Sequence, residues 1–369
     1  MTARAPRIAA EVAAQLAARH AVRAEVAVLQ PADPFLDMAG EDMRRRMFLT
    51  ESETGQTLCL RPEFTIPVCR DHIVAGARKA RRWYLGEVFR QRRDGAAEFH
   101  QAGLEDLGDP DEAAADARVL ADAHAVASLA RRDLTVTLGD QGVFEAVLIA
   151  LGLPEGWRRR LARAFGDSGQ LDLALADLGR PKGAAHDGEV AALIAAGDAT
   201  GLAAHIVGEM AAAGLSATAG RAPEEIARRA LEKAALATVR LEKKALAALT
   251  EFLAIRSGLD KAPAALSAFA IRSGLALDAA LARFGARVAA IAAEGLDPAA
   301  LAYDAAFGRP LDYYTGLVFE ISAPGLDKPL AGGGRYDRLL TLLGAPSPIA
   351  GVGFSVWLDR LDKAAGGAS

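Results

Sequence analysis

The chain has 369 residues, of which 51% are hydrophobic and 24% are charged, enough apolar material for one large domain and a smaller one. Its 43 Lys and Arg residues stand against 47 Asp and Glu residues, which gives a net charge of -4. No broad cationic field is therefore available for a phosphate backbone, and nucleic acid is not an expected partner.

The chain has two cysteines, Cys59 and Cys69, and neither has a second Cys or a His at the spacing of a metal site. Neither a metal nor a cofactor is expected, and both thiols are expected to be buried in a reducing cytoplasm. No run of about 18 apolar residues suggests a membrane span, and the N-terminus lacks the pattern of a secretory signal. The sequence predicts a cytoplasmic protein without a membrane partner.

The first third of the chain is expected to contain a helix and several short strands. The alanine-rich residues 7–21 predict a surface amphipathic helix. A strand is expected next, closed by a proline that cannot donate to a ladder, and then two hairpins with glycine in their turns. The strand is residues 25–31, and the hairpins pair 48–50 with 57–60 around 53–55, and 83–91 with 99–107 around 93–95.

The rest of the chain changes from helical to strand character and back. Residues 111–132 have a helical period, and 134–138 return to a strand. From about 143 to 300 the sequence is almost continuously helix-forming, with breaks at 153–154 and 179–181. The hexapeptide Ala-Ile-Arg-Ser-Gly-Leu occurs at 254–259 and 270–275, which is interpreted as two similar helix ends, because one pair is too little for a solenoid.

Strand character returns at residues 317–321 and 351–356, before a short helix with Arg360. Strands at both ends of a helical middle predict a discontinuous α+β core. The expected core is residues 1–145 and 300–369, and the expected insertion, mainly helical, is residues 146–299.

Two motifs in the first third could form a polar pocket. In Leu60-Arg61-Pro62-Glu63-Phe64-Thr65 the proline stiffens a turn, so Glu63 and Thr65 could clamp an ammonium group, although Glu63 could equally be a solvated or capping residue. In Glu98-Phe99-His100-Gln101-Ala102-Gly103-Leu104-Glu105, residues four apart on a strand share a face. Gln101 and Glu105 could thus line one pocket, or this strand face could simply be solvated.

Two further motifs lie near the end of the chain, in residues 308–316 and 331–337. The first contains Leu311-Asp312-Tyr313-Tyr314, and the second begins with Ala331-Gly332-Gly333-Gly334. Successive glycines allow a backbone to approach a ligand or a strand closely, although they could also form a tight hairpin turn. Tyr314 and Tyr336 could likewise be core residues that each have one satisfied hydroxyl.

In this order, and with Gly353-Phe354-Ser355-Val356-Trp357-Leu358-Asp359-Arg360, the four motifs resemble the catalytic core of the class II histidyl-tRNA synthetases. The likeness covers most of residues 1–130 and 300–362. It implies an antiparallel sheet flanked by helices, usually in a dimer formed through the N-terminal motif. It also implies that Glu63, Thr65 and Gln101 hold the amino group of histidine. Glu105, Tyr314 and Tyr336 would surround the imidazole.

The resemblance also reveals departures from a working synthetase. Arg90, Arg309 and Arg360 match the family arginines that bind or activate a nucleotide. The synthetase pattern Arg-x-Glu-Arg is however replaced by Arg90-Gln91-Arg92-Arg93, where an arginine, which has no acceptor, stands in place of the carboxylate against adenine. The loop of residues 94–97 is short, and nine residues follow Arg360, where synthetases continue into an anticodon-binding domain. These arginines are interpreted as a vestigial nucleotide- or anion-binding site, and no catalytic residue is assigned.

A synthetase-like core that keeps its amino-acid pocket is similar to the regulatory subunits of the two-component ATP phosphoribosyltransferases. Their typical segments resemble residues 30–37, 40–42 and 60–68. The resemblance implies a non-catalytic subunit that a short catalytic subunit requires in the first step of histidine biosynthesis, and that mediates feedback inhibition by histidine. A homodimer within a larger hetero-oligomer is expected. Two alternatives remain open, a stand-alone histidine-activating aminoacyl transferase and a scaffold with a vestigial pocket.

Overall fold

The computed structural model describes residues 6–38, 41–93, 95–179, 188–214, 222–237, 239, 241–309 and 313–366. The strands are β1 (Val22–Arg23), β2 (Leu29–Pro31), β3 (Leu49–Glu51), β4 (Thr57–Leu60), β5 (Ala80–Phe89), β6 (Glu98–Leu107), β7 (Thr135–Asp140), β8 (Arg256–Gly258), β9 (Ala302–Asp304), β10 (Leu317–Ser322), β11 (Ala331–Arg335) and β12 (Gly351–Trp357). The helices of the first half are α1 (Ala9–Ala17), α2 (Asp33–Met38), α3 (Glu41–Arg44), α4 (Thr65–Ala75), α5 (Glu112–Ala127), α6 (Gln141–Ala150), α7 (Glu155–Ala164) and α8 (Ser168–Gly179). Those of the second half are α9 (Gly188–Ala196), α10 (Ala199–Ala212), α11 (Pro223–Ala237), α12 (Lys243–Leu253), α13 (Ala262–Ser273), α14 (Asp278–Ala293), the 3-10 turn η1 (Pro298–Ala300), α15 (Asp337–Leu342) and α16 (Leu358–Ala364).

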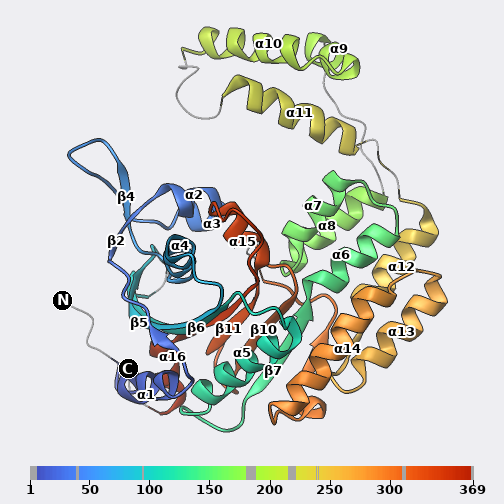
Figure 1. The fold of residues 1–369 in the computed structure, drawn as a ribbon. Coiled ribbons are helices and arrows are strands. Elements are labelled where there is room, and N and C mark those ends of the chain that lie inside the picture. The colour runs from blue at the N-terminus through green and yellow to red at the C-terminus, as the bar shows by residue number, and fades with distance from the viewer. Residues whose placement is uncertain are drawn as a thin grey trace.

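The centre of the fold is a nine-stranded sheet of order β1-β5-β6-β12-β11-β10-β7-β9-β8. Its six middle strands, from β5 to β7, are all antiparallel, as predicted, whereas β1 pairs with β5 and β7 with β9 in parallel. Helices α4 and α15 cover one face, and α1, α5 and α16 cover the other (Figure 1). A mixed sheet flanked by helices therefore confirms the predicted α+β class.

Both predicted hairpins are confirmed, as β3 with β4 and β5 with β6. Of the second turn, Asp94 lies outside the described residues, as do Arg180 and Pro181 of the predicted helix break. The strand predicted over residues 25–31 is wrong in its first half, because only Leu29–Pro31 pairs with β4. The carbonyl oxygens of Val26 and Val28 instead accept hydrogen bonds from the guanidinium and the backbone N–H of Arg61.

The glycines at 332–334 do not form a hairpin turn, which was one of the two interpretations of this run. It is part of β11, a central strand on which Gly333 pairs with Phe319 on one side and with Phe354 on the other. The two hexapeptides also differ. The second ends α13 at Gly274, but the first leaves α12 and enters β8, because the neighbouring strand β9 offers a ladder there.

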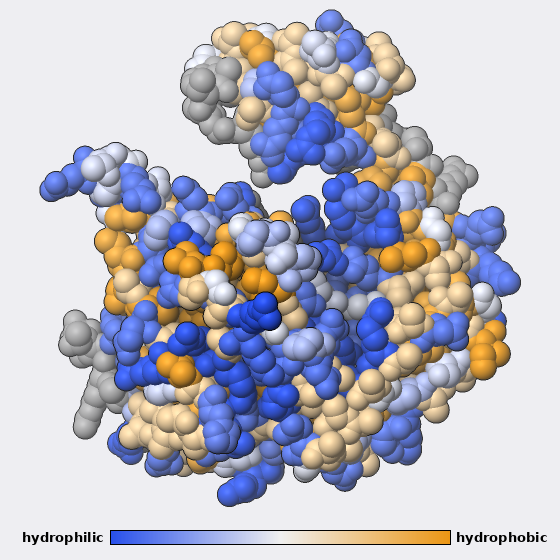
Figure 2. Space-filling view, viewed as in Figure 1, coloured by the Kyte–Doolittle hydropathy of each residue, from blue (hydrophilic) through white to orange (hydrophobic). Residues whose placement is uncertain are grey.

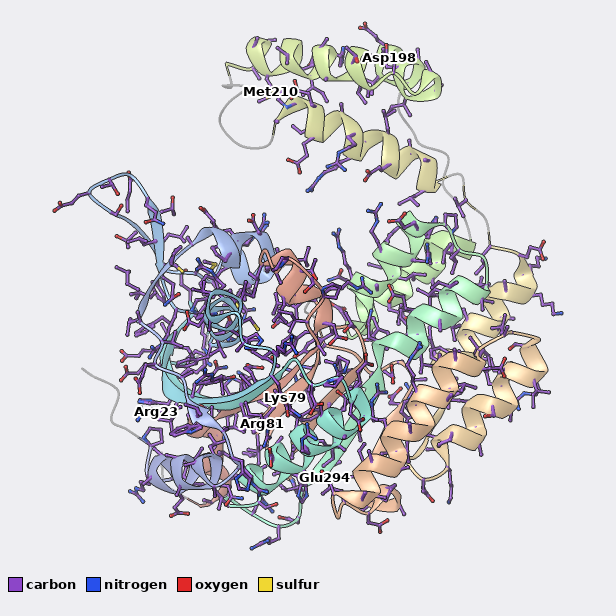
Figure 3. All side chains as sticks on the ribbon, in the orientation of Figure 1. Arg23, Lys79, Arg81, Asp198, Met210 and Glu294 are labelled. Carbon is purple, nitrogen blue, oxygen red and sulfur yellow. The ribbon has the colours of Figure 1, made fainter. Side chains whose placement is uncertain are left out.

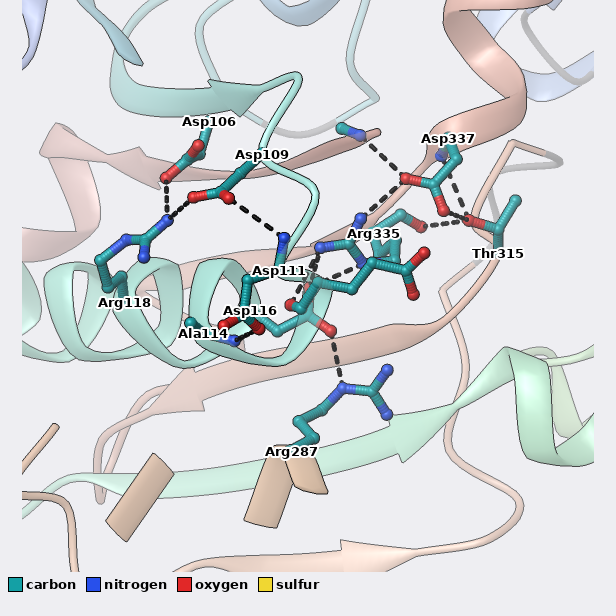
Figure 4. A network of polar contacts seen from close by, with 12 residues as sticks. Asp106, Asp109, Asp111, Ala114, Asp116, Arg118, Arg287, Thr315, Arg335 and Asp337 are labelled. Atoms are coloured by element: carbon teal, nitrogen blue, oxygen red, sulfur yellow. Dashed lines mark hydrogen bonds and ion pairs between the residues drawn. The ribbon is translucent and has the colours of Figure 1, made fainter. Parts of the chain in front are cut away.

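A buried ion-pair network joins the sheet to the helical region (Figure 4). Asp116 of α5, which is fully buried, accepts from Arg335 of β11 (Nε···Oδ1, 2.9 Å) and from Arg287 of α14 (Nε···Oδ2, 2.6 Å). Arg287 also pairs with Asp140, which caps the N-terminus of α6. Arg335 continues to Asp337 (2.8 Å). One carboxylate thus joins α5, α14 and a central strand.

Helices α9, α10 and α11 form an arm that stands off from the body in the space-filling view (Figure 2). The arm has a small core of its own, in which Leu202, Ala203 and Ala227 are buried. Asp198 caps α10, and Met210 lies near the opposite end of that helix (Figure 3). The arm is attached where the Trp157 Nε1 donates to the carbonyl of Leu236 (2.9 Å). In the parts of the chain that the structure describes, no helix is long and apolar enough to cross a bilayer.

Candidate functional site

A cavity of about 280 Å³ lies against the face of the sheet that α4 and α15 cover. It is lined by all six residues predicted to hold histidine, which are Glu63, Thr65, Gln101, Glu105, Tyr314 and Tyr336. Arg90 and Arg309 also line it, whereas Arg360 does not. Segments far apart in the sequence therefore bring eight of the nine predicted site residues to one cavity.

Glu105 is the most enclosed of these side chains, at 1% exposure. Its Oε1 accepts from the hydroxyls of Thr65 (2.8 Å) and Tyr84 (3.2 Å), and its Oε2 accepts from the hydroxyl of Tyr336. Burial raises the pKa of Glu105 to about 8, against the opposite effect of these hydrogen bonds. Binding of an N–H donor or a cation to this carboxylate would therefore be strongly favoured, because the poorly solvated charge would gain a partner.

Glu63 lies two residues before Thr65, the first residue of α4, and its carboxylate accepts from the backbone N–H groups of Thr65 (2.6 Å) and Ile66 (3.0 Å). It therefore does cap the helix, which was the alternative interpretation of this residue. It also lines the cavity, and burial raises its pKa, whereas the charge of Arg90 lowers it. A carboxylate accepts more than two hydrogen bonds, so capping leaves Glu63 able to bind a ligand ammonium.

Two polar atoms of cavity-lining residues are buried without a hydrogen-bond partner among the described residues, the Oε1 of Gln101 and the Nε of Arg309. Gln101 is 2% exposed. An unpaired buried polar group costs about 1–3 kcal/mol, so a ligand that paired with these atoms would recover that energy.

Glycines make room for the site side chains. A Cβ atom at Gly332 would overlap the guanidinium of Arg309, and a Cβ atom at Gly353 would overlap the carboxylate of Glu105. Arg309 in turn pairs with Glu320 of β10 (2.8 Å). The absence of a side chain at these two strand positions is therefore what allows a charged group to lie flat on the sheet.

The other cavity-lining residues were not assigned from the sequence. Phe35 and Met38 of α2 form an apolar part of the wall, and no polar pattern in the sequence marks them. Ser355 and Trp357 lie within the last motif and Tyr313 within the tyrosine doublet, so their motifs were signals for them.

Arg90, Arg92 and Arg360 are held by aromatic rings and backbone carbonyl oxygens. Arg90 lies over the ring of Phe99 (5.7 Å) and donates to the carbonyl of Pro62 (2.6 Å). The guanidinium of Arg92, the residue that stands in place of the expected glutamate, lies 3.4 Å from the ring centroid of Phe99. Arg360 lies over Trp357 (4.1 Å) and donates to the carbonyl of Pro329 (2.6 Å). Burial lowers the pKa of Arg90 and that of Arg360 to about 10 each.

The two cysteines are buried and free, as predicted. Within the described ranges, no group of three or more His, Cys, Asp or Glu side chains is placed to hold a metal ion.

A sequence model described as histidyl-tRNA synthetase matches residues 23–196 and 199–361 of the chain. Curated relatives named ATP phosphoribosyltransferase regulatory subunit are 65% identical in Mesorhizobium japonicum, 60% in a Chelativorans species and 58% in Sinorhizobium medicae. Each of these alignments covers 98% of this chain and 98% of the relative. This chain belongs to the family of ATP phosphoribosyltransferase regulatory subunits.

The solved structures that resemble this regulatory subunit show its fold. A protein of Bacillus halodurans, titled an ATP phosphoribosyltransferase regulatory subunit/histidyl-tRNA synthetase, has 22% identity and a TM-score of 0.64, over 97% of this chain and 79% of that one. The histidyl-tRNA synthetase of a Nostoc species has 16% identity and a TM-score of 0.65, over 98% and 73%. The predicted synthetase-like fold is confirmed. The names of the curated relatives also confirm the prediction of a regulatory rather than a catalytic subunit.

Proposed function

We propose that this regulatory subunit binds free histidine in the 280 Å³ cavity, and thereby controls a short catalytic ATP phosphoribosyltransferase subunit that requires it for the first step of histidine biosynthesis. One observation carries the proposal. The buried carboxyl of Glu105 and the partly buried carboxyl of Glu63 line the same cavity, and desolvation raises the pKa of both. A ligand with an ammonium group at one end and imidazole N–H groups at the other offers each carboxylate a donor.

The polar residues of the cavity divide between the two ends of such a ligand. Glu63, Thr65 and Gln101 would hold the amino group, with the unpaired Oε1 of Gln101 as an acceptor for it. Glu105, Tyr314 and Tyr336 would surround the imidazole ring. Arg90 and Arg309 would lie beside the ligand as a remnant of a nucleotide- or anion-binding site, whereas Arg360 does not line the cavity.

Feedback inhibition requires that histidine bind two states of the assembly with unequal affinity. A coupling free energy of about 1–3 kcal/mol is typical of such regulation, and it changes an affinity by about 5- to 150-fold. The burial of Glu105 can supply an energy of this size, because a new hydrogen bond to a buried charged group contributes about 1.5–3 kcal/mol.

The function is tested by mixing the chain with a short catalytic subunit and measuring phosphoribosyl-ATP formation with and without histidine. We expect activity only in the mixture, and a loss of that activity when histidine is added. Activation without any response to histidine would contradict the regulatory role and indicate a scaffold. Histidine-dependent exchange of pyrophosphate into ATP by the chain alone would indicate an aminoacyl transferase instead.

The location of the histidine site is tested by calorimetry on Glu105→Ala and Tyr336→Phe variants. Both should bind histidine more weakly than the unmodified chain. A Tyr303→Phe variant is the matched control, because Tyr303 is as buried as Tyr336 but packs against Phe284 and does not line the cavity. Unchanged affinity in the first two variants would place histidine elsewhere.

The proposed homodimer within a larger hetero-oligomer is supported by apolar side chains around the small sheet of β2, β4 and β3. Val28, Leu29 and Leu49 are 40%, 47% and 52% exposed there. A Leu49→Asp variant should lower the molar mass measured by light scattering. An unchanged mass would rule out this surface as the contact.

A further inference from the structure

Three side-chain positions form a row across the sheet directly behind the cavity. Tyr84 of β5 is in register with Gly103 of β6, and Gly103 is in register with Ser355 of β12. A Cβ atom at Gly103 would overlap the hydroxyl of Tyr84. Because Gly103 has no side chain, the ring of Tyr84 crosses β6 and its hydroxyl reaches the third strand.

The Tyr84 hydroxyl lies at the meeting point of three acceptors. It is 3.2 Å from Oε1 of Glu105, 2.9 Å from Oγ of Ser355 and 3.3 Å from the carbonyl oxygen of Phe354. Tyr84 itself is fully buried and does not line the cavity, whereas Glu105 and Ser355 do. The hydroxyl therefore acts on the site through residues that line it, chiefly Glu105 and Ser355.

The ring that carries this hydroxyl is fixed in place. It stacks on Phe64 with the ring centroids 4.5 Å apart and the planes inclined by 10°. Phe64 is covered in turn by the guanidinium of Arg61, whose Cζ lies 4.5 Å from the Phe64 centroid. Such a stack leaves the hydroxyl little freedom to follow a moving partner.

A phenol has one proton to donate, so it can serve only one of the three acceptors at a time. When Glu105 is ionised its oxygen is the strongest acceptor of the three, and the hydroxyl of Ser355 can donate to Tyr84 in its turn. The resulting chain of hydrogen bonds runs from Ser355 at the cavity wall, through Tyr84, to Glu105.

We propose that Tyr84 is a positioning residue of the histidine site, which holds the Glu105 carboxylate from behind in the orientation that receives an imidazole N–H. This inference rests on the proposed function, since it concerns the same cavity. With Tyr84 and Thr65 on Oε1 and Tyr336 on Oε2, the carboxylate is fixed at both oxygens. Without the Tyr84 hydroxyl, Oε1 would keep only Thr65, and Ser355 would lose its partner.

The loss of Tyr84 also has a signature that lost packing would not produce. The hydrogen bond from Tyr84 lowers the pKa of Glu105, so its removal should raise that pKa further and delay ionisation to a higher pH. The groups that act on Glu105 from its surroundings are Glu63, Cys69, Tyr84, Tyr313, Tyr314 and Tyr336. Burial raises the pKa of the Cys69 thiol and of these phenols above their ordinary values. The remaining acid among them is Glu63, whose pKa burial raises and the charge of Arg90 lowers.

The test is calorimetric titration of the full chain with histidine across a pH series from about 6 to 9, a range that includes the Glu105 pKa of about 8. A Tyr84→Phe variant keeps the ring stack and removes the hydroxyl. We expect it to bind histidine about tenfold more weakly, as for one lost hydrogen bond to a charged group. Its affinity should also rise with pH later than that of the unmodified chain. Tyr303→Phe, which removes a buried hydroxyl elsewhere, should change neither property.

A Ser355→Ala variant tests the same chain of hydrogen bonds from the cavity side, and it decides the question if Tyr84→Phe does not fold. It should shift the pH profile in the same direction by a smaller amount. If Glu105→Gln abolishes binding but Tyr84→Phe and Ser355→Ala leave affinity and pH profile unchanged, the inference is overturned and the proposed function stands. If the unmodified chain does not bind histidine at any pH, both are overturned.

Discussion

Replacement of Glu105 by glutamine should make the ligand-free protein less sensitive to pH. Burial raises the pKa of this carboxyl from 4.5 to about 8 in the folded protein. Between these two values the folded state keeps a proton that the unfolded chain has released, so the free energy of unfolding falls as pH rises. Above about 8 both states are ionised, and this contribution to the slope ends.

The size of the effect follows from the same shift. Each pKa unit corresponds to about 1.36 kcal/mol, so ionisation of Glu105 should lower the stability by on the order of 5 kcal/mol across the whole window. Glutamine has no proton to release, so the variant lacks this part of the slope. Glu63, whose pKa burial also raises, is present in both proteins and its contribution largely cancels in the difference.

The assay is urea denaturation of both proteins, without histidine, in steps from about pH 5 to pH 8, the range in which the ordinary and the raised pKa lie. The difference in unfolding free energy between the variant and the unmodified chain should increase steadily with pH. Parallel pH profiles would show that Glu105 ionises in the folded protein as it does in the unfolded chain. The account of a buried, proton-retaining carboxyl in the cavity would then be refuted.

Three further predictions concern the cavity, the ion network and the arm. Gly353→Ala should weaken histidine binding at least about tenfold, because the new Cβ overlaps the Glu105 carboxylate. Gly208→Ala, on open surface of α10, should leave it unchanged, and equal calorimetric affinities for both variants would contradict the overlap. Asp116→Asn should lower the free energy of unfolding by about 3–5 kcal/mol, because it leaves two buried arginines underpaired, and an Asp133→Asn variant at the surface is the control. A loss no larger than that of the control would show that the network contributes little. Leu236→Ala should loosen the arm, and faster proteolysis within residues 188–237 would show it, whereas an unchanged rate would mean that the arm is anchored elsewhere.

Local sequence patterns were sufficient for the features that depend on neighbours in the chain. The turn residues and alternating runs predicted the β3–β4 and β5–β6 hairpins. The two-residue period of a strand correctly placed Gln101 and Glu105 on one face of β6. These successes share a cause, since strand alternation and turn geometry are decided within a few residues.

Features that depend on distant partners could not be predicted in this way. The carbonyl oxygens of Val26 and Val28 accept hydrogen bonds from Arg61, a residue of a later segment, and not from a neighbouring strand. The first hexapeptide became a strand only because β9 lies beside it. The division into a core of residues 1–145 and 300–369 and an insertion of residues 146–299 stays a prediction. The ion pair between Asp116 of α5 and Arg287 of α14 joins the predicted core to the predicted insertion.

The family resemblance predicted the polar residues that line the cavity, and the structure shows which residues surround them. Tyr84 does not line the cavity, and its importance follows only from the register that carries its ring over Gly103. Phe35 and Met38 come from a short helix whose sequence has no polar signature. Neither kind of contact is encoded in the spacing of residues along the chain.

The most direct test of the account is a crystal structure of the chain with histidine bound. We expect the imidazole ring to lie within hydrogen-bond distance of the Glu105 carboxylate and the Tyr336 hydroxyl, with the ammonium group at Glu63 and Gln101. Histidine found at another surface, with only solvent in this cavity, would contradict it.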